Sequence, residues 1–176
     1  KNELLDIDAI VRLVRIFSGL GVRTVRLTGG EPLVRRGLPE LIARLRNEVG
    51  ITDLALTTNA TALAFHARSL AEAGVRRINV SVDTVVPETF KTLTRGGNFA
   101  RVERGLDAAY AAGITDIKTN SVVVRGKNDG QLADIVRWAW GRGFTPRFIE
   151  LMPLGEAARL GRQAVFSVAE MKDRLQ

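Results

Sequence analysis

The segment Val25–Pro32 reads VRLTGGEP: a short run with apolar residues ends in two glycines, an acid and a proline. Such a run predicts a strand, and Gly29–Gly30 followed by Pro32 predicts a tight turn after it. A glycine pair at a strand end also lets a ligand touch the backbone, where N–H and C=O groups suit a small zwitterion. A plain strand–helix turn explains the same glycines, so both interpretations stay open.

Further runs rich in β-branched residues follow, each separated from the next by an amphipathic helical pattern. The predicted strands are 22–27, 53–56, 78–82, 117–124 and 146–151. The predicted helices are 8–17, 38–49, 61–73, 99–112, 131–140 and 168–175, with a short extra helix at 88–93. Ser167 and Glu170 predict a capping box at the last helix. This alternation predicts an α/β fold with a parallel sheet, either open or curved into a barrel.

We expect residues 1–176 to form a single domain, because no linker or low-complexity segment divides them. A helix precedes the first predicted strand, whereas a parallel sheet of this kind normally opens with a strand. We therefore expect a strand to be missing upstream.

Composition narrows the class of protein. The chain has 26 Lys and Arg against 19 Asp and Glu, one His and no Cys. The lack of cysteine excludes disulfides, thiolate metal sites and cysteine nucleophiles. A net charge of +7 suits an anionic partner such as a nucleotide. The basic residues are spread along the chain without interleaved aromatics, so we expect no nucleic acid partner.

The sequence gives no sign of a membrane or of export. No apolar segment approaches the roughly 20 residues that a spanning helix needs, and the start lacks the apolar core of a secretory signal. We therefore expect a cytoplasmic protein without membrane contact.

Polar residues follow or end the predicted strands, where βα folds bind their ligands. Arg26 shares the face of Thr28 and is a candidate for phosphate or carboxylate binding; a partly exposed arginine beside an acid is the alternative. Lys118 lies in an apolar run. It is either the Schiff-base nucleophile of an aldolase or a lysine whose head lies in solvent.

Other polar and aromatic residues are expected to be structural. Asp83 is expected to cap the turn that follows it, and His66 to lie on a helix surface. Trp138 and Trp140 cannot face the same side of a helix, so one is expected in the core and the other partly exposed.

Five segments, in this order and at these intervals, resemble the MoaA family of radical S-adenosylmethionine (SAM) enzymes. They read VRLTGGEPLVRR, LALTTNA, INVSVDT, IKTNSVVVRGKND and RFIELMPLG, and the resemblance covers about residues 4–155. Members of this family are GTP 3′,8-cyclases, lyases of molybdenum-cofactor biosynthesis. The resemblance implies a partial (βα) TIM-like barrel with parallel strands, of the radical SAM type and truncated at both ends.

By matching positions, the resemblance also assigns two sets of ligand contacts. The expected contacts to S-adenosylmethionine are Gly30, Ser81 and Met152. The expected contacts to GTP are Arg26, Thr57 and Lys118, with Arg147 as a further phosphate partner. Lys118 then clamps an anion instead of forming a Schiff base. Ala60 stands where the family usually has glycine, which is expected to tighten that turn.

The implied reaction uses a 5′-deoxyadenosyl radical, made from S-adenosylmethionine at a 4Fe-4S cluster, to convert GTP to a cyclic pterin precursor. The family holds two such clusters with an N-terminal CxxxCxxC loop and three C-terminal cysteines. This chain has no cysteine, and such clusters depend on thiolate ligands. We therefore expect a piece of the enzyme that is inactive alone.

Two alternatives remain open. One is another radical SAM enzyme, haem-modifying or peptide-modifying, that shares the GGEP turn and the sheet. The other is a non-catalytic βα module that binds an anion or a partner protein. A homodimer is left open by the sequence.

Overall fold

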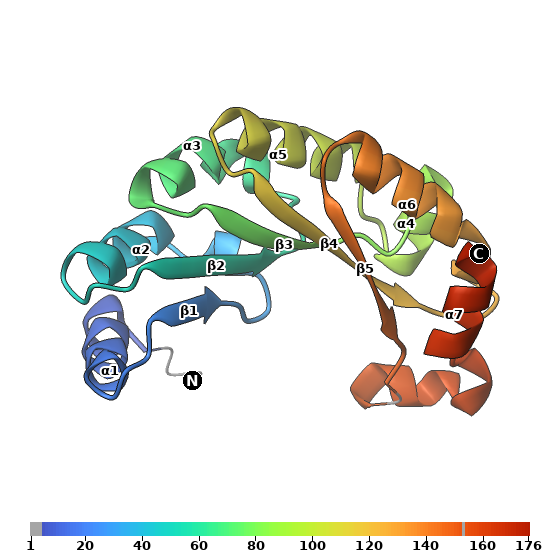
Figure 1. Ribbon diagram of the computed structural model, residues 1–176, viewed down its shortest axis with the longest axis horizontal. Helices are drawn as coiled ribbons and strands as arrows, with labels where there is room; N and C mark the ends of the chain where they lie inside the picture. Colours follow the sequence, from blue (N-terminus) through green and yellow to red (C-terminus); the bar gives the residue numbers. More distant parts are fainter. Residues whose placement is uncertain (1–4, 153) are drawn as a thin grey trace.

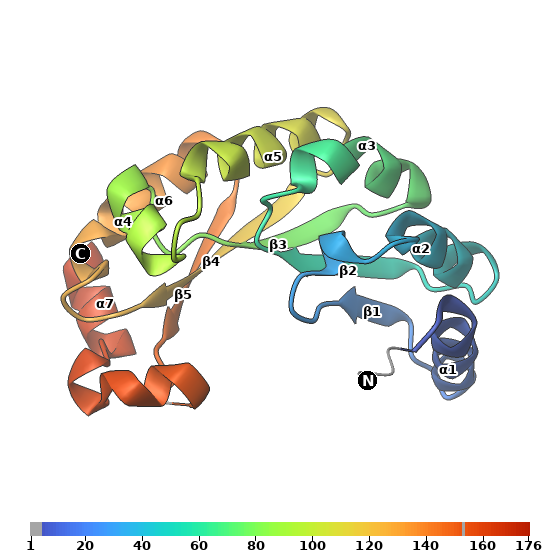
Figure 2. The same ribbon diagram turned by 180° about the vertical axis from the view of Figure 1, so that it is seen from behind.

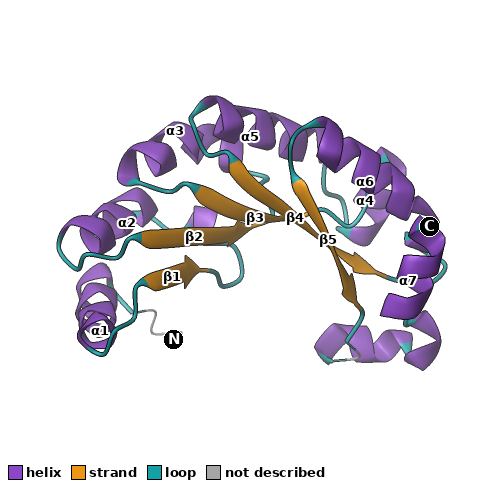
Figure 3. Cartoon of the chain, in the orientation of Figure 1, coloured by secondary structure: helices purple, strands orange, loops and turns teal. Residues whose placement is uncertain are grey.

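The computed structural model describes residues 5–152 and 154–176. Within them, five strands alternate with helices along the chain (Figure 3). The order of the strands in the sheet is their order in the sequence, and every neighbouring pair is parallel. The strands are β1 (Thr24–Leu27), β2 (Asp53–Thr58), β3 (Arg77–Ser81), β4 (Asp116–Val123) and β5 (Thr145–Glu150).

The helices confirm the predicted pattern. They are α1 (Ile7–Gly19), α2 (Leu38–Asn47), α3 (Leu63–Ala73), α4 (Pro87–Leu93), α5 (Phe99–Ala111), α6 (Leu132–Gly141) and α7 (Val168–Leu175). Four short 3-10 helices were not predicted: η1 (Pro32–Val34), η2 (Asp129–Gln131), η3 (Gly155–Leu160) and η4 (Arg162–Ala164). The capping box of Ser167 and Glu170 at α7 is present in full.

The sheet curves into an open arc, and helices α2, α3, α5 and α6 lie along its outer side (Figures 1 and 2). Successive side chains of a strand point to opposite faces. In β4, Ile117 and Thr119 are buried against the helices, whereas Lys118 and Asn120 on the other face are partly exposed. No helix of the described residues covers this inner face (Figure 1). The architecture is the predicted partial TIM-like barrel, open and not closed.

The hydrophobic core fills the space between the sheet and the outer helices. Its main residues from the strands are Leu54, Leu56, Ile78, Val80 and Ile117, and those from the helices include Ile42, Leu45, Leu63, Leu70, Val102 and Leu106. Burying each such side chain contributes about 1.5–3 kcal/mol. Helices α3 and α5 approach closely at Gly105, where an added Cβ would lie 2.7 Å from the carbonyl oxygen of Ala60.

One structural prediction for a single residue was wrong and another is confirmed. Asp83 does not cap the turn that follows it, because its carboxylate accepts a hydrogen bond from the main-chain N–H of Val122 on β4, at 2.8 Å. Trp138 is partly buried against Phe99, whereas Trp140 is 69% exposed, as the helical spacing predicted. None of the helices within 5–152 and 154–176 is long and apolar enough to cross a membrane.

Candidate functional site

The strand register arranges the inner face of the sheet in three rows. Neighbouring rows are two residues apart along each strand, or about 6.6 Å. The amino-end row contains Arg26, Ala55, Arg77 and Asp116. The middle row contains Thr57, Asn79, Lys118 and Thr145. The carboxyl-end row contains Ser81, Asn120 and Arg147. Polar and charged side chains therefore share one helix-free face.

The GGEP turn follows β1 at the carboxyl end of the sheet. Gly29 has φ 150°, a backbone conformation that residues with a Cβ rarely adopt. An added Cβ at Gly30 would meet no atom within 4 Å, so the peptide groups of the turn are open to a ligand. Both glycines line a cavity of about 680 Å³. The size is that of a pocket for a small molecule.

Glu31 fixes this turn to the next strand. Its carboxylate accepts hydrogen bonds from the hydroxyl of Thr58 at 2.6 Å, from the main-chain N–H of Asn59 at 2.8 Å and from the main-chain N–H of Leu33 at 3.1 Å. Two of these donors belong to the segment at the end of β2. The carboxylate thus holds the glycine turn in register with β2, a role that sequence analysis missed.

Positive side chains lie on the lower part of the inner face, below the rim. The Nζ atom of Lys118 lies 3.0 Å from the carboxylate of Asp116, two residues earlier on the same strand. Arg77 pairs with Asp53 at 2.8 Å. Arg26 is exposed and makes no ion pair with a described residue. Among the described residues of the inner face, Arg26 and Arg147 thus have no carboxylate partner, whereas Lys118 and Arg77 each pair with a carboxylate that a bound anion has to displace.

A smaller cavity of about 170 Å³ lies at the carboxyl ends of β2 and β3, and Asn59, Ser81 and Asp83 line it. Burial raises the pKa of Asp83 above its ordinary value, and the hydrogen bond from Val122 opposes this shift. Burial disfavours the charged carboxylate, whereas a donated hydrogen bond favours it.

The structure brings most of the predicted ligand residues onto one face, with differences in depth. Ser81 and Gly30 lie at the rim, and Thr57 and Lys118 lie one row below. Lys118 does not lie at the carboxyl end of its strand, because it is the third of the eight residues of β4. Arg147 and Met152 come from the far edge: Arg147 lies in β5 and Met152, 64% exposed, follows it.

Among the polar residues of this face that the sequence analysis missed are Asp116 and Asn79. Asp116 had a readable signal, because residues i and i+2 of a strand share a face. Asn79 had a weaker one, since it stands inside the apolar run INVSV. Both lie beside the predicted ligand residues.

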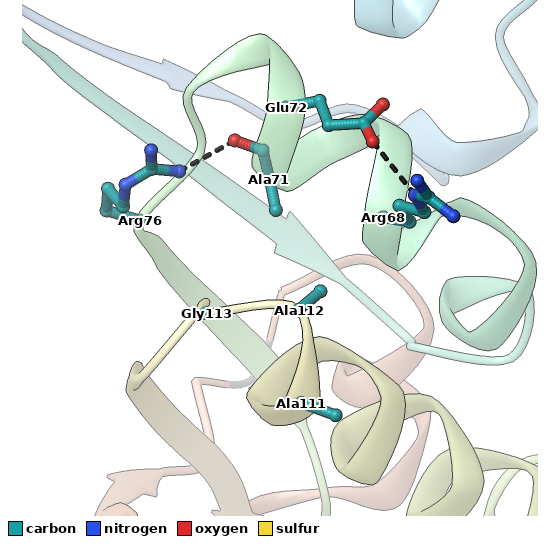
Figure 4. Close-up of a pocket in the computed structure, with 7 residues that line it drawn as sticks. All are labelled: Arg68, Ala71, Glu72, Arg76, Ala111, Ala112 and Gly113. Carbon is teal, nitrogen blue, oxygen red and sulfur yellow. Dashed lines mark hydrogen bonds and ion pairs between the residues drawn. The ribbon is translucent and has the colours of Figure 1, made fainter.

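Another depression lies at the opposite end of the strands (Figure 4). It measures about 660 Å³ and is lined by α3, α5 and the segments that precede β3 and β4. Its polar groups are satisfied locally: Arg68 pairs with Glu72 at 2.9 Å and Arg76 donates to the carbonyl oxygen of Ala71 at 2.7 Å. This depression is remote from the glycine turn and is not part of the candidate site.

Nothing in the described part of the chain forms a metal site. No group of three or more His, Cys, Asp or Glu side chains is placed to hold an ion among residues 5–152 and 154–176. The sequence has no cysteine at all.

The chain is similar to known proteins. The radical SAM superfamily matches residues 1–139. A curated GTP 3′,8-cyclase from Caulobacter vibrioides is 50% identical over 159 residues, which are 89% of this chain and 45% of the relative. A second, from Hydrogenovibrio crunogenus, is 48% identical over 156 residues, 89% of this chain and 47% of the relative. The chain thus spans less than half the length of these two relatives.

The fold also matches solved structures. The crystal structure of HydG, a maturase of the [FeFe]-hydrogenase, superposes with a TM-score of 0.74 over 99% of this chain and 43% of that chain. The sequence identity is 16%, so this likeness concerns the fold alone.

Proposed function

The chain belongs to the radical SAM superfamily, and we propose that it is the central part of a GTP 3′,8-cyclase, a lyase of molybdenum-cofactor biosynthesis. Relatives at 48% and 50% identity that carry this name support the proposal. We propose GTP and S-adenosylmethionine as its small-molecule partners.

The observation that carries the proposal is the shared placement of Arg26, Thr57 and Lys118. All three lie on the helix-free inner face, within two neighbouring rows. Two cations and a hydroxyl at this spacing suit a phosphate chain, because ionised donors make the stronger hydrogen bonds to phosphate oxygens. Arg147, one row higher on β5, extends the positive surface toward the rim.

The rim residues fit S-adenosylmethionine. The open peptide groups at Gly30 and the cavity of about 680 Å³ beside them suit a zwitterionic amino acid group. We propose that Gly30, Ser81 and Met152 contact this molecule. When bound, it supplies the radical that begins the reaction. The residues of this chain bind and orient the two molecules, and the inner face keeps them next to each other.

A 4Fe-4S cluster does not fit the residues present. Its irons are held by thiolates, and the 176 residues include no cysteine. The ligands of any cluster are therefore not among these residues, and we assign no step of the reaction to a cluster held by them.

Several further properties belong to the same proposal. We propose that residues 1–176 act as one domain, in the cytoplasm, without a nucleic acid partner. A homodimer is the assembly to test first, because the outer edges of β1 and β5 can pair with a strand of a second copy.

Titration calorimetry of the full-length protein with GTP tests the proposal. We expect Arg26→Ala and Lys118→Ala each to weaken GTP binding about tenfold or more, since each removes a charged donor worth about 1.5–3 kcal/mol. Arg137→Ala is the matched control, because Arg137 lies on the outer helix α6 and pairs with Asp134 at 2.6 Å. If GTP does not bind, or if Arg26→Ala and Lys118→Ala both bind it as the wild type does, the cyclase assignment fails.

A haem-modifying or peptide-modifying relative is the second candidate. It shares the fold, as the likeness to a maturase illustrates, but does not require two cations below the rim. If the Lys118→Ala variant binds a peptide or a porphyrin with the same affinity as the wild type, the result favours this second candidate.

A further inference from the structure

Asn79 differs from the other buried asparagine of the described residues. Both side chains are almost fully enclosed, Asn79 at 2% exposure and Asn128 at 1%. The amide of Asn128 is satisfied: it donates to the carbonyl oxygens of Asp83 and Val122, at 2.7 and 2.9 Å, and accepts from the N–H of Val124 at 2.8 Å. Asn79 makes no side-chain hydrogen bond with any described residue.

The position of Asn79 points its amide toward the candidate site. Its neighbours in sequence, Ile78 and Val80, face the helix-covered core, so Asn79 faces the inner side of the sheet. The register pairs it with Thr57 on one side and with Lys118 on the other. Its amide atoms are not among the polar atoms that are sealed from the surface without a partner. The amide therefore keeps a small solvent contact, and the strand alternation places it on the inner face.

A buried amide without a partner costs stability, about 1–3 kcal/mol by comparison with a satisfied one. An apolar residue would fill the same place in an otherwise apolar strand without that cost. The presence of an asparagine at position 79 is explained if a ligand supplies the hydrogen bonds that its amide lacks. We infer that Asn79 is a further substrate-binding residue, whose amide binds the ribose hydroxyls of the nucleotide. This inference rests on the proposed function.

The choice of ribose follows from distance and chemistry. Neighbouring strands lie about 4.8 Å apart, so Asn79 is one strand away from the cation of Lys118 that is proposed for phosphate. In a nucleotide, the sugar is the group next to the phosphate. Each of its hydroxyls both donates and accepts a hydrogen bond, and an amide offers two donors and an acceptor side by side.

The test compares GTP with 2′,3′-dideoxyGTP, which lacks both ribose hydroxyls, by titration calorimetry on the full-length protein. We expect the wild type to prefer GTP by about tenfold, the size of a well-made hydrogen bond. Asn79→Ala should bind the two nucleotides equally and melt at the same temperature or higher, since no internal hydrogen bond is lost. Asn79→Asp, which keeps the shape and brings a negative charge next to the phosphate site, should bind GTP more weakly than Asn79→Ala.

Asn128→Ala is the matched control. It should lower the melting temperature, because three internal hydrogen bonds are lost, and should keep the preference for GTP. A preference for GTP that survives in Asn79→Ala, or that is absent from the wild type, overturns the ribose contact while the cyclase assignment stands. Failure of the wild type to bind GTP at all overturns both.

Discussion

Glu31 connects the glycine turn after β1 to the end of β2. Three hydrogen bonds converge on its carboxylate; one donor, Thr58, is the last residue of β2, and another, Asn59, follows it directly. The turn that exposes the peptide groups of Gly30 is therefore set by an acid that itself need not touch the ligand. Removal of this acid should disturb both stability and S-adenosylmethionine binding.

We expect Glu31→Gln to destabilise the protein by about 1–3 kcal/mol, because an amide nitrogen replaces an acceptor and leaves a donor unpaired. S-adenosylmethionine should bind several-fold more weakly. Chemical denaturation and calorimetry measure the two effects. Glu40→Gln on α2 is the control: the Glu40 side chain makes no hydrogen bond with a described residue, and the free energy of unfolding should change by less than about 0.5 kcal/mol. Equal effects of both substitutions would contradict the role assigned to Glu31.

Asp116 pairs with Lys118 at 3.0 Å, so a phosphate bound at Lys118, as we propose, has to compete with this carboxylate. We expect Asp116→Asn to strengthen GTP binding up to about fivefold at low salt, since such partly exposed pairs are worth about 0–1 kcal/mol. The gain should shrink as salt screens the charges. Asp107→Asn, which breaks a pair with Arg142 on the outer side, should leave the affinity unchanged. Weaker binding of GTP by Asp116→Asn would show that the carboxylate orients Lys118 instead of competing for it.

The residues of the site differ in how far the sequence reveals them. The pair of Asp116 and Lys118 can be read from strand alternation, because both residues belong to one strand. The contact of Glu31 with Asn59 joins residues 28 positions apart, and no local pattern specifies such a partner. Asn79 was missed because it stands among apolar residues, and the run as a whole is typical of a buried strand.

Helices α3 and α5 make their close contact at Gly105. A Cβ at this position would lie 2.7 Å from the carbonyl oxygen of Ala60 and 3.0 Å from the Cβ of Leu63. The oxygen belongs to the backbone, which cannot rotate away. We expect Gly105→Ala to destabilise the protein by about 1–3 kcal/mol through overpacking, against a gain of about 1 kcal/mol in helix propensity.

The control for this substitution is Gly141→Ala at the end of α6, where an added Cβ meets no atom within 4 Å. This variant should be neutral or slightly more stable. Thermal melts of the two variants measure the difference. An unchanged melting temperature for Gly105→Ala would mean that the two helices move apart without cost.

Helix α7 is attached by an acid with a strongly lowered pKa. The N–H of Ser167, together with Arg125 and the hydroxyl of Ser167, lowers the pKa of Glu170 from 4.5 to about 2. A carboxyl with a depressed pKa stabilises the fold fully above its unfolded value and loses this contribution as the pH falls from about 4.5 to about 2. We expect Glu170→Gln to remove that part of the acid dependence, which denaturation at several pH values measures. Parallel curves for variant and wild type would refute this linkage.

Most elements could be predicted because their signals are local. Glycines and the Ser167 cap mark helix ends, and every predicted helix and strand lies within two residues of its observed bounds. The end of β2 could not be predicted from local sequence. Thr57 and Thr58 extend this strand because they pair with Asn79 and Val80, which lie on β3 and are distant in the sequence. The short helices η3 and η4 could not be predicted, because they have neither a side-chain cap nor a long apolar stripe.

At the scale of the whole molecule, we expect the 176-residue chain alone to be unable to start the reaction. With S-adenosylmethionine, GTP and a strong reductant, the purified chain should yield no 5′-deoxyadenosine above background, because it has no thiolate to hold a cluster. Chromatography of the quenched mixture measures this product. The full-length protein, reconstituted with iron and sulfide, is the positive control. Formation of the nucleoside by the chain alone would contradict the expectation.

The architecture follows from a pattern that repeats along the whole chain. Alternating strands and helices predict a parallel sheet, and strand periodicity decides which residues face the helices. The choice between an open sheet and a curved one was not decided by this pattern, since curvature results from the packing of all strands and helices together. The likeness of the sequence to a known family supplied the missing information.

The two outermost strands, β1 and β5, each have a strand partner on one side only among the described residues. Main-chain donors and acceptors on the outer side can then recruit an extended peptide from a neighbouring molecule. A preparation of the chain would accordingly turn cloudy with concentration and storage time, and aged material would seed fresh solution. Short peptides that match either border strand would compete for these positions and keep the solution clear.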